Sequence, residues 1–422
     1  MVINNNVLSI LIASSMLIFA LRGKFGAAVI TICVLLIIFL KLTRKKIKIS
    51  YCYFYAVFLL GFAVIFHAVR SYSFEYYLLI GYLAATLVLM NSDLNIYNKL
   101  WNVLGYISIF EAIGIYMQWL LPTVYYSFIS LILPSSVIFA IRNRLAGGYY
   151  TGFCREVSYT MFFVVIGLGI YIFNLVESKN EIISCKKKRI IIIVFLLGAL
   201  VISGKRATLL FFVVAIFIIQ FINSRDRLKI VKYLLLGMAF IGAVWVLYPL
   251  WSRVPALSRI VDLLKYISAD DMVGITNGRT AIYENAIELW KKNRMFGIGW
   301  GNFKYSTSQS TWYVGFDVHN CYLQILCETG IIGAIFYYIL TFFSIINSIR
   351  SILITRKYGE EMHNLALLTG FIQIFFCMYC ITEPILYEYT DYIIYFISIN
   401  ITCLILKHTK MIKQKENNKG WV

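Results

Sequence analysis

The sequence predicts an all-α, polytopic membrane protein, with about twelve helices crossing the bilayer and one large extracytoplasmic loop. First, 60% of the 422 residues are hydrophobic and only 14% are charged, whereas soluble domains are about 45–50% apolar and 25% charged. Second, the apolar residues fall in blocks of about 15–22, long enough to span about 30 Å of hydrocarbon. Third, much of the net charge of +19 lies in short runs between the blocks. Such runs are typical of topology signals and argue against a nucleic-acid partner.

The apolar blocks predict one integral membrane domain over residues 1–422. The first block is followed by Arg22 and Lys24 and is interpreted as a retained span or signal anchor. A further apolar segment at 127–141 is expected to lie in the interface or to re-enter the membrane. The expected spans are approximately 7–21, 25–40, 51–69, 76–90, 100–121, 157–176, 190–203, 207–222, 231–250, 320–348, 365–382 and 391–406.

The distribution of basic residues predicts that both termini are cytoplasmic. With that orientation, the cytoplasmic loops and the tail at 407–422 hold 23 of the 39 Lys and Arg residues. The short outer segments hold eight, and the long loop at 251–319 holds another eight. Long segments largely escape the positive-inside rule, so the short loops decide the orientation. Long loops in compact proteins are usually functional, which draws attention to the outer segments 122–156 and 251–319.

Two basic sites in the outer segments are candidates for anion binding. Lys205 and Arg206 separate two apolar blocks at the outer membrane surface. They are either a snorkelling pair that closes a helical hairpin or an anion-binding site, since guanidinium binds phosphate in a planar, bidentate manner. Arg279 precedes an amphipathic helical stretch that Asn277 or Thr280 is expected to cap. Arg279 would then lie at the positive N-terminal end of that helix, which attracts anions.

His319 stands at the outer boundary of the span that begins near 320, beside Asp317 and Asn320. It is either a hydrogen-bonded cap or a general base, because its ordinary pKa is near neutrality. Glu328 lies about two turns into the same span, where a carboxylate must be paired or must face a wet cavity. Asp317 and His319 lack a third ligand, so no metal site is expected.

The long loop and the start of the next span carry an ordered set of motifs. They are Asn277-Gly278-Arg279, Leu289-Trp290, Phe296-Gly297-Ile298-Gly299-Trp300-Gly301-Asn302-Phe303, and His319-Asn320 followed by Tyr322-Leu323, Leu326, Glu328 and Gly330-Ile331-Ile332-Gly333. This set resembles the O-antigen ligase and polymerase family of bacterial membrane glycosyltransferases, and within it a Wzy-type polysaccharide polymerase. The Ser203-Gly204-Lys205-Arg206 segment resembles the family's helix-boundary arginine motif. Because lysine at 205 departs from that motif, Arg206 is the residue to carry over.

The resemblance implies a bundle similar to the GT-C type in the bacterial cytoplasmic membrane. It implies an undecaprenyl-diphosphate-linked oligosaccharide as donor, inversion at the anomeric carbon, and no metal, nucleotide or other cofactor. The expected partners are this substrate, membrane lipid and a chain-length regulator protein. His319 would accept the proton of the attacking hydroxyl, and the diphosphate would be bound by Arg206, Arg279 and Arg155. The supporting residues would be Lys205, Asn320, Glu328 and Asp317, with Glu328 or Asp317 orienting the imidazole.

The sequence leaves alternatives open for the activity and for the role of the aromatic residues. A ligase that transfers the finished glycan to a lipid core or a protein would use the same chemistry. A flippase for the lipid-linked oligosaccharide would also need basic residues outside, but it should carry charges along its spans and show paired halves. The aromatic residues of the long loop form either a sugar-binding face or part of the headgroup belt. They are Trp300, Phe303, Tyr305, Trp312, Tyr313 and Phe316.

Overall fold

A computed structural model describes residues 94–173, 183–224, 269, 278–306, 316–385 and 389–419. All the spans predicted within these ranges are helices, and these described ranges contain no strand. The predicted spans at 7–21, 25–40, 51–69, 76–90 and 231–250 lie outside the described residues. The helices are α5 Leu94–Leu120, α6 Pro122–Ile132, α7 Ser135–Ala146, α8 Val157–Ile172, α9 Ile183–Ile202, α10 Arg206–Asn223, α15 Thr280–Lys292, α16 Phe303–Ser306, α17 Cys321–Thr355, α18 Glu360–Tyr379 and α19 Tyr389–Lys419.

Within the described residues, five helices are long and apolar enough to cross a membrane: α5, α10, α17, α18 and α19. The helix α8 is apolar but has only 16 residues. The predicted span at 320–348 is too short, because α17 continues to Thr355. Its helical path is interrupted at Gly330, which has a φ of 65°.

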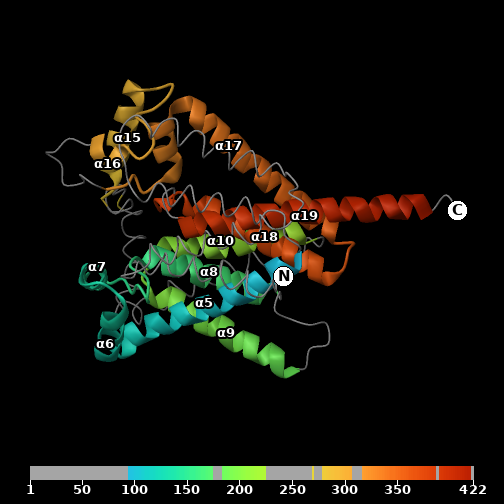
Figure 1. The fold of residues 1–422 in the computed structure, drawn as a ribbon, viewed down its shortest axis with the longest axis horizontal. Helices are drawn as coiled ribbons and strands as arrows, with labels where there is room; N and C mark the ends of the chain where they lie inside the picture. Colours follow the sequence, from blue (N-terminus) through green and yellow to red (C-terminus); the bar gives the residue numbers. More distant parts are fainter. Residues whose placement is uncertain are drawn as a thin grey trace, which may run out of the picture.

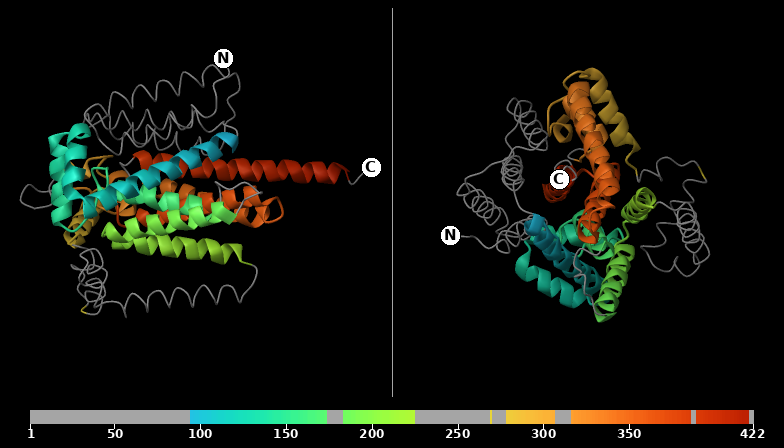
Figure 2. Two further views of the ribbon diagram at one scale, coloured as in Figure 1. Left: turned by 90° about the horizontal axis from the view of Figure 1, so that it is seen from below. Right: turned by 90° about the vertical axis from the view of Figure 1, so that its right-hand side faces the viewer.

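The helices form a bundle with two chemically different ends (Figure 1). The helices α6, α7, α15 and α16 lie at one end, which we call the loop end; the left view of Figure 2 shows this end from below. The turns at 203–205 and 380–385 lie at this end, where α9 and α18 finish. The opposite end, which we call the basic end, carries Lys186–Arg189, Arg356, Lys357 and Lys407. The described parts of the segments predicted at 122–156 and 251–319 therefore lie at the same end of the bundle.

The central helix is α8, in which every residue from Tyr159 to Tyr171 is buried. It is shielded by α5, α9, α18 and α19. Glu111 of α5 is buried beside it, and its Oε2 accepts hydrogen bonds from the Phe153 amide (3.1 Å) and the Thr160 hydroxyl (3.2 Å). A buried carboxyl group needs such partners in the membrane. Glu111 is therefore explained by structural hydrogen bonds between elements.

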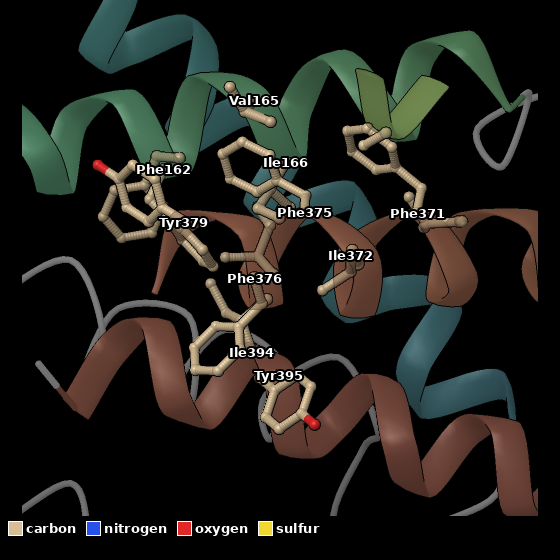
Figure 3. Close-up of a cluster of buried hydrophobic side chains, with 14 of the residues drawn as sticks. Phe162, Val165, Ile166, Phe371, Ile372, Phe375, Phe376, Tyr379, Ile394 and Tyr395 are labelled. Carbon is tan, nitrogen blue, oxygen red and sulfur yellow. The ribbon is translucent and has the colours of Figure 1, made fainter. Parts of the chain in front are cut away.

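An aromatic cluster joins α8, α18 and α19 (Figure 3). Phe375 stacks on Tyr379 with ring centroids 5.3 Å apart, and Phe162 lies 5.8 Å from Tyr379. The Tyr379 hydroxyl donates to the carbonyl oxygen of Ser158 at 2.9 Å. Aromatic packing and this hydrogen bond attach the end of α18 to the start of α8. The turn at 380–385 is thereby positioned at the loop end.

The segment predicted to lie at the interface, 127–141, forms parts of two short helices. The helix α6 ends before Leu133, and Pro134 stands at the N-cap of α7. Proline lacks an amide hydrogen and cannot continue a helix, so the chain turns there. The helices have 11 and 12 residues, too few to cross about 30 Å of hydrocarbon.

Candidate functional site

His319 and Asn320 form the entry to α17. The Asn320 Oδ1 accepts a hydrogen bond from the Leu323 amide at 3.0 Å, which makes Asn320 the N-cap. His319 has a φ of 56°, in the left-handed region that a residue with a β-carbon seldom occupies. The cap role is therefore filled by Asn320 and leaves the imidazole for another purpose. The imidazole Nδ1 is buried and has no hydrogen-bond partner among the described residues.

The glycine-rich segment after α15 docks on the interruption in α17. The Ile298 amide donates to the Cys327 carbonyl (3.0 Å) and the Gly299 amide donates to the Glu328 carbonyl (2.9 Å). A β-carbon on Gly330 would approach the Met295 oxygen to 2.3 Å, and one on Gly297 would approach the Glu328 carbonyl carbon to 2.3 Å. Glycine is therefore needed on both sides of this contact, because two backbones meet there.

The side chain of Glu328 completes the same contact. Its oxygens accept hydrogen bonds from the amides of Gly301 (2.9 Å) and Phe303 (3.3 Å). Asp317 lies 3.2 Å from the ammonium nitrogen of Lys304. Since the imidazole Nδ1 of His319 has no partner in the described part of the chain, neither carboxylate orients the ring through that nitrogen. The contacts of Glu328 assign it to positioning the loop.

Arg279 reaches the site from α15. The helix begins at Thr280, with Arg279 at the N-cap and no side-chain capping bond. The expectation that Thr280 caps the helix is wrong, and Asn277 lies outside the described residues. The expected placement of Arg279 at the N-terminal end is confirmed. Its Nη1 donates to the carbonyl oxygen of Thr382 at 2.5 Å, so the guanidinium lies against the turn after α18. The helix is held in place by a small core of Ile282, Ala286, Phe303, Val318 and Cys327.

Lys205 reaches the same turn from the start of α10. Its ammonium nitrogen lies 2.5 Å from Oε1 of Glu383, and both side chains are largely buried. The hydroxyl of Ser158, at the start of α8, donates to Glu383 Oε2 at 2.6 Å. The Lys205 ammonium also donates to that hydroxyl, at 2.9 Å. A buried carboxylate is therefore satisfied by an ammonium and a hydroxyl, as burial requires.

Electrostatic interactions connect these groups with His319. Burial raises the pKa of Glu383, but the cations of Lys205 and Arg279 and two hydrogen bonds outweigh burial and lower it to about 2. Burial and the neighbouring Arg279 cation lower the pKa of His319 from 6.5 to about 3, while Glu383 acts in the opposite direction. At neutral pH the carboxylate is charged and the imidazole is neutral. The imidazole is thus in the form that accepts a proton.

The predicted arginines Arg206 and Arg155 and a third arginine, Arg144, are also among the described residues. Arg206 begins α10, directly after Lys205, and is half-buried. Arg155 is half-buried in the segment before α8. Arg144 forms a bidentate ion pair with Glu156, at 2.8 and 3.2 Å, and its cation also lowers the pKa of His319. The structure therefore brings Lys205, Arg279 and His319 together, while Asn320 and Glu328 support the surrounding backbone.

Sequence reasoning did not identify Glu383 and Ser158. The available signal was a carboxylate between the apolar residues Ile381 and Ile385, at the end of a predicted span, where a carboxylate is costly unless it is paired. The aromatic residues expected to form a sugar-binding face or part of the headgroup belt differ in their exposure. Trp300 and Phe303 are buried and belong to the core, whereas Tyr305 and Phe316 are exposed. Trp312 and Tyr313 lie outside the described residues. No group of three or more His, Cys, Asp or Glu residues in the described ranges could hold a metal ion.

A family model matches a part of the chain that carries several of these site residues. Residues 191–338 match the model of the family described as O-antigen ligase. The matched part contains Lys205, Arg279 and His319, whereas Ser158 and Glu383 lie outside it. None of the curated proteins with which the chain was compared matches it. Together with the long apolar helices, the match supports a multi-pass membrane protein with an enzymatic activity of the ligase or polymerase type. Over residues 191–338, the chain is similar to the O-antigen ligase family.

Proposed function

We propose that this protein is a polysaccharide polymerase of the Wzy type. It would transfer a glycan from undecaprenyl diphosphate to a second lipid-linked repeat unit, for O-antigen, capsule or a related surface polymer. The protein would lie in the bacterial cytoplasmic membrane, with cytoplasmic termini and with the loop end outside, and would work with a chain-length regulator. The match to the O-antigen ligase family supports this general chemistry.

One observation carries the proposal: two cations from separate elements converge beside a buried imidazole. Arg279 donates to Thr382 at 2.5 Å, and Lys205 lies 2.5 Å from the adjacent Glu383. Both cations lower the pKa of His319, which places their charges near the ring. Cations in a partly buried site bind a diphosphate strongly, and a neighbouring neutral imidazole can accept a proton.

The proposed reaction is a direct displacement. The oxygen of an acceptor hydroxyl attacks the anomeric carbon as the bond to the diphosphate oxygen breaks, so the configuration inverts. His319 accepts the proton of the hydroxyl, and undecaprenyl diphosphate leaves with the bonding electron pair. Arg279, Lys205 and Arg206 would stabilise the negative charge that develops on the leaving diphosphate. General-base catalysis contributes about 10²–10⁴ in rate.

The bound substrate would make His319 a stronger base. In the free protein, burial and Arg279 lower the pKa of the imidazole to about 3. A diphosphate close to the ring favours the protonated imidazolium and therefore raises that pKa. The base would thus become effective when the donor is bound.

A ligase activity is the second candidate, since the matching family is described as O-antigen ligase. The donor site and the base would be the same, and the acceptor would be a lipid core or a protein. Supplying purified enzyme with one donor and each acceptor in turn distinguishes the two. Elongation of lipid-linked repeats supports the polymerase, and transfer to the core alone supports the ligase.

The central test is replacement of the base and of one cation. We expect His319→Ala and Arg279→Ala to accumulate single lipid-linked repeats, with polymer reduced at least about 100-fold. The measurement is electrophoresis of the polymer together with mass spectrometry of the extracted lipid-linked sugars. Repeats trapped on the cytoplasmic leaflet would instead indicate a flippase.

Matched controls come from the basic end. His408 and Arg350 are exposed, and His408→Ala and Arg350→Ala should leave polymer formation unchanged at equal membrane abundance. Normal polymer in a well-inserted His319→Ala variant would exclude the histidine from the mechanism.

A further inference from the structure

Glu383 is a buried carboxylate that the proposed reaction does not use. Only 5% of the surface of Glu383 is exposed. It lies in the turn after α18 and contacts side chains of α8 and α10. Burying a carboxylate is costly even when it is paired, so pairing alone does not make it a good stabiliser. Its position at the point where the cations converge therefore suggests a role in binding.

The two cations approach this turn from different elements. Lys205 at the start of α10 contacts the Glu383 carboxylate directly, at 2.5 Å. Arg279 at the start of α15 contacts the preceding carbonyl, that of Thr382, also at 2.5 Å. A carboxylate and a phosphate are alternative anionic partners for the same ammonium and guanidinium groups. Glu383 is thus an anion that contacts one of these cations, and the carbonyl group of the residue before it contacts the other.

The backbone that carries Glu383 is also held by groups other than the two cations. The Cys321 amide donates to the Cys380 carbonyl at 2.8 Å, and the Cys321 thiol donates to the Glu383 carbonyl at 3.2 Å. The Tyr379 hydroxyl anchors the same turn to α8. Lysine and arginine side chains are long and rotate easily, whereas this turn is attached to two helices. When a diphosphate binds, we expect the cations to move and the carboxylate to stay.

We infer that Glu383 is the resident counter-anion of the diphosphate site, which holds Lys205 and Arg279 in place until the substrate displaces it and which then promotes release of the product diphosphate. This inference rests on the proposed function. It makes Glu383 a positioning residue, since it acts through the cations and contacts neither the reacting carbon nor the hydroxyl. Like charges at short range repel, so the carboxylate lowers affinity for any diphosphate.

The test is the affinity for inorganic pyrophosphate, a soluble probe of the site, in metal-free buffer. In Glu383→Gln the shape and one hydrogen-bonding oxygen remain but the charge is lost. We expect the inhibition constant for pyrophosphate to fall about tenfold. The KM for the lipid-linked donor should fall together with kcat, because the product leaves slowly. A residue with a merely structural role would lose activity without tighter binding.

The matched control is Glu288→Gln, which removes an exposed ion pair with Lys292 on α15. It should change neither the inhibition constant nor kcat. A folded Glu383→Gln variant with unchanged or weaker pyrophosphate affinity would overturn the inference.

A second variant keeps the inference testable if Glu383→Gln does not fold. Ser158→Ala removes the hydroxyl that donates to Glu383 at 2.6 Å and accepts from Lys205 at 2.9 Å, and it leaves the ion pair between Lys205 and Glu383. The carboxylate is then held less firmly, so pyrophosphate should bind more tightly, by a smaller factor than in Glu383→Gln. Weaker binding in this variant would also contradict the inference.

The proposed function and this inference fail in different ways. If the wild-type protein forms no glycan polymer or transfer product, the proposed function fails. Pyrophosphate should still raise the melting temperature of Glu383→Gln more than that of the wild type, since a ligand that binds the folded state stabilises it. If polymer forms and depends on His319 but pyrophosphate binds equally to both proteins, only the role of Glu383 is excluded.

Discussion

At the scale of single residues, burial and nearby charge determine which groups can react. His319 and Glu383 lie in one cluster, yet their pKa values move for different reasons. Burial and the Arg279 cation lower the pKa of the imidazole to about 3. The cations overcome burial at Glu383 and lower the pKa of its carboxyl to about 2. The cluster therefore combines a neutral base with a permanent anion at neutral pH.

The first prediction concerns the pH dependence of the reaction. The free enzyme keeps His319 in its basic form at every pH above about 3. Because kcat/KM reports the free enzyme, it should not fall between about pH 7 and about pH 5. Because the bound diphosphate raises the imidazole pKa, kcat should decline at a higher pH than kcat/KM. Initial rates over a range of donor concentrations and pH measure both quantities.

The lowered pKa of His319 also determines how this residue affects the free energy of folding as the pH changes. An unfolded chain would protonate His319 below about pH 6.5, whereas the folded protein does so only near pH 3. The unfolded state therefore binds more protons in this interval, and His319 makes folding less favourable as the pH falls.

An acidic limb of kcat/KM centred near the ordinary histidine pKa would contradict the kinetic prediction.

At the scale of elements, the site is built from helix ends and one loop contact. Asn320 caps α17, and Arg279 and Lys205 stand at the N-caps of α15 and α10. The loop after α15 docks on α17 at Gly330, where the interrupted helix leaves carbonyl groups free to accept hydrogen bonds. This contact sets the distance between Arg279 and His319, because it holds α15 against α17.

The second prediction tests that contact with two glycines of positive φ. Gly330 has a φ of 65° and Gly359 a φ of 51°, so alanine at either position adds about 1–3 kcal/mol of backbone strain. A β-carbon at Gly330 would also meet the Met295 oxygen at 2.3 Å, whereas one at Gly359 would meet nothing within 4 Å. Gly330→Ala should therefore destabilise the protein by about 1–3 kcal/mol more than Gly359→Ala.

Thermal unfolding in detergent or nanodiscs gives the comparison for the glycine variants. Polymer formation adds a second readout, since Gly359 lies outside the site and its variant should stay active. Equal losses of stability in the two variants would show that the docked loop contributes little.

At the scale of the whole molecule, the bundle separates its chemistry between two ends. The loop end carries the imidazole and the cations that converge on the turn after α18, whereas the basic end carries the lysine and arginine run of α9 and the ends of α17 and α19 (Figure 1). Under the proposed function, lipid-linked substrates enter from the membrane, and a site at one end of the helices would lie at the depth of the carrier's diphosphate. Basic residues on the cytoplasmic side are typical of membrane proteins.

The third prediction is that the two ends lie on opposite sides of the membrane. Asn143 and Tyr305 are exposed at the loop end, and Lys357 and Lys410 are exposed at the basic end. Single cysteines at the first pair should react with an impermeant maleimide added to intact cells, above the wild-type background. Cysteines at the second pair should react only after the membrane is permeabilised. Labelling of Lys357→Cys in intact cells would contradict this orientation.

The sequence alone determined the helical membrane class and the approximate positions of the described helices. It also identified Arg279 and His319 as candidate site residues. These features depend on local hydrophobicity and on short motifs, which can be read along the chain. It did not predict the extension of α17 to Thr355 or the role of Asn320 as its cap. It offered Glu328 or Asp317 as the residue that orients the imidazole and did not predict the hydrogen bonds of Glu328 to the loop amides.

Only the tertiary structure decided which side chains meet. Ser158, Lys205, Arg279 and Glu383 come from distant parts of the chain, and no local pattern encodes their contact. The reason is physical: hydropathy specifies which segments leave water, whereas the packing of aromatic side chains between α8, α18 and α19 specifies how their ends align. The counter-anion at Glu383 is a result of that alignment.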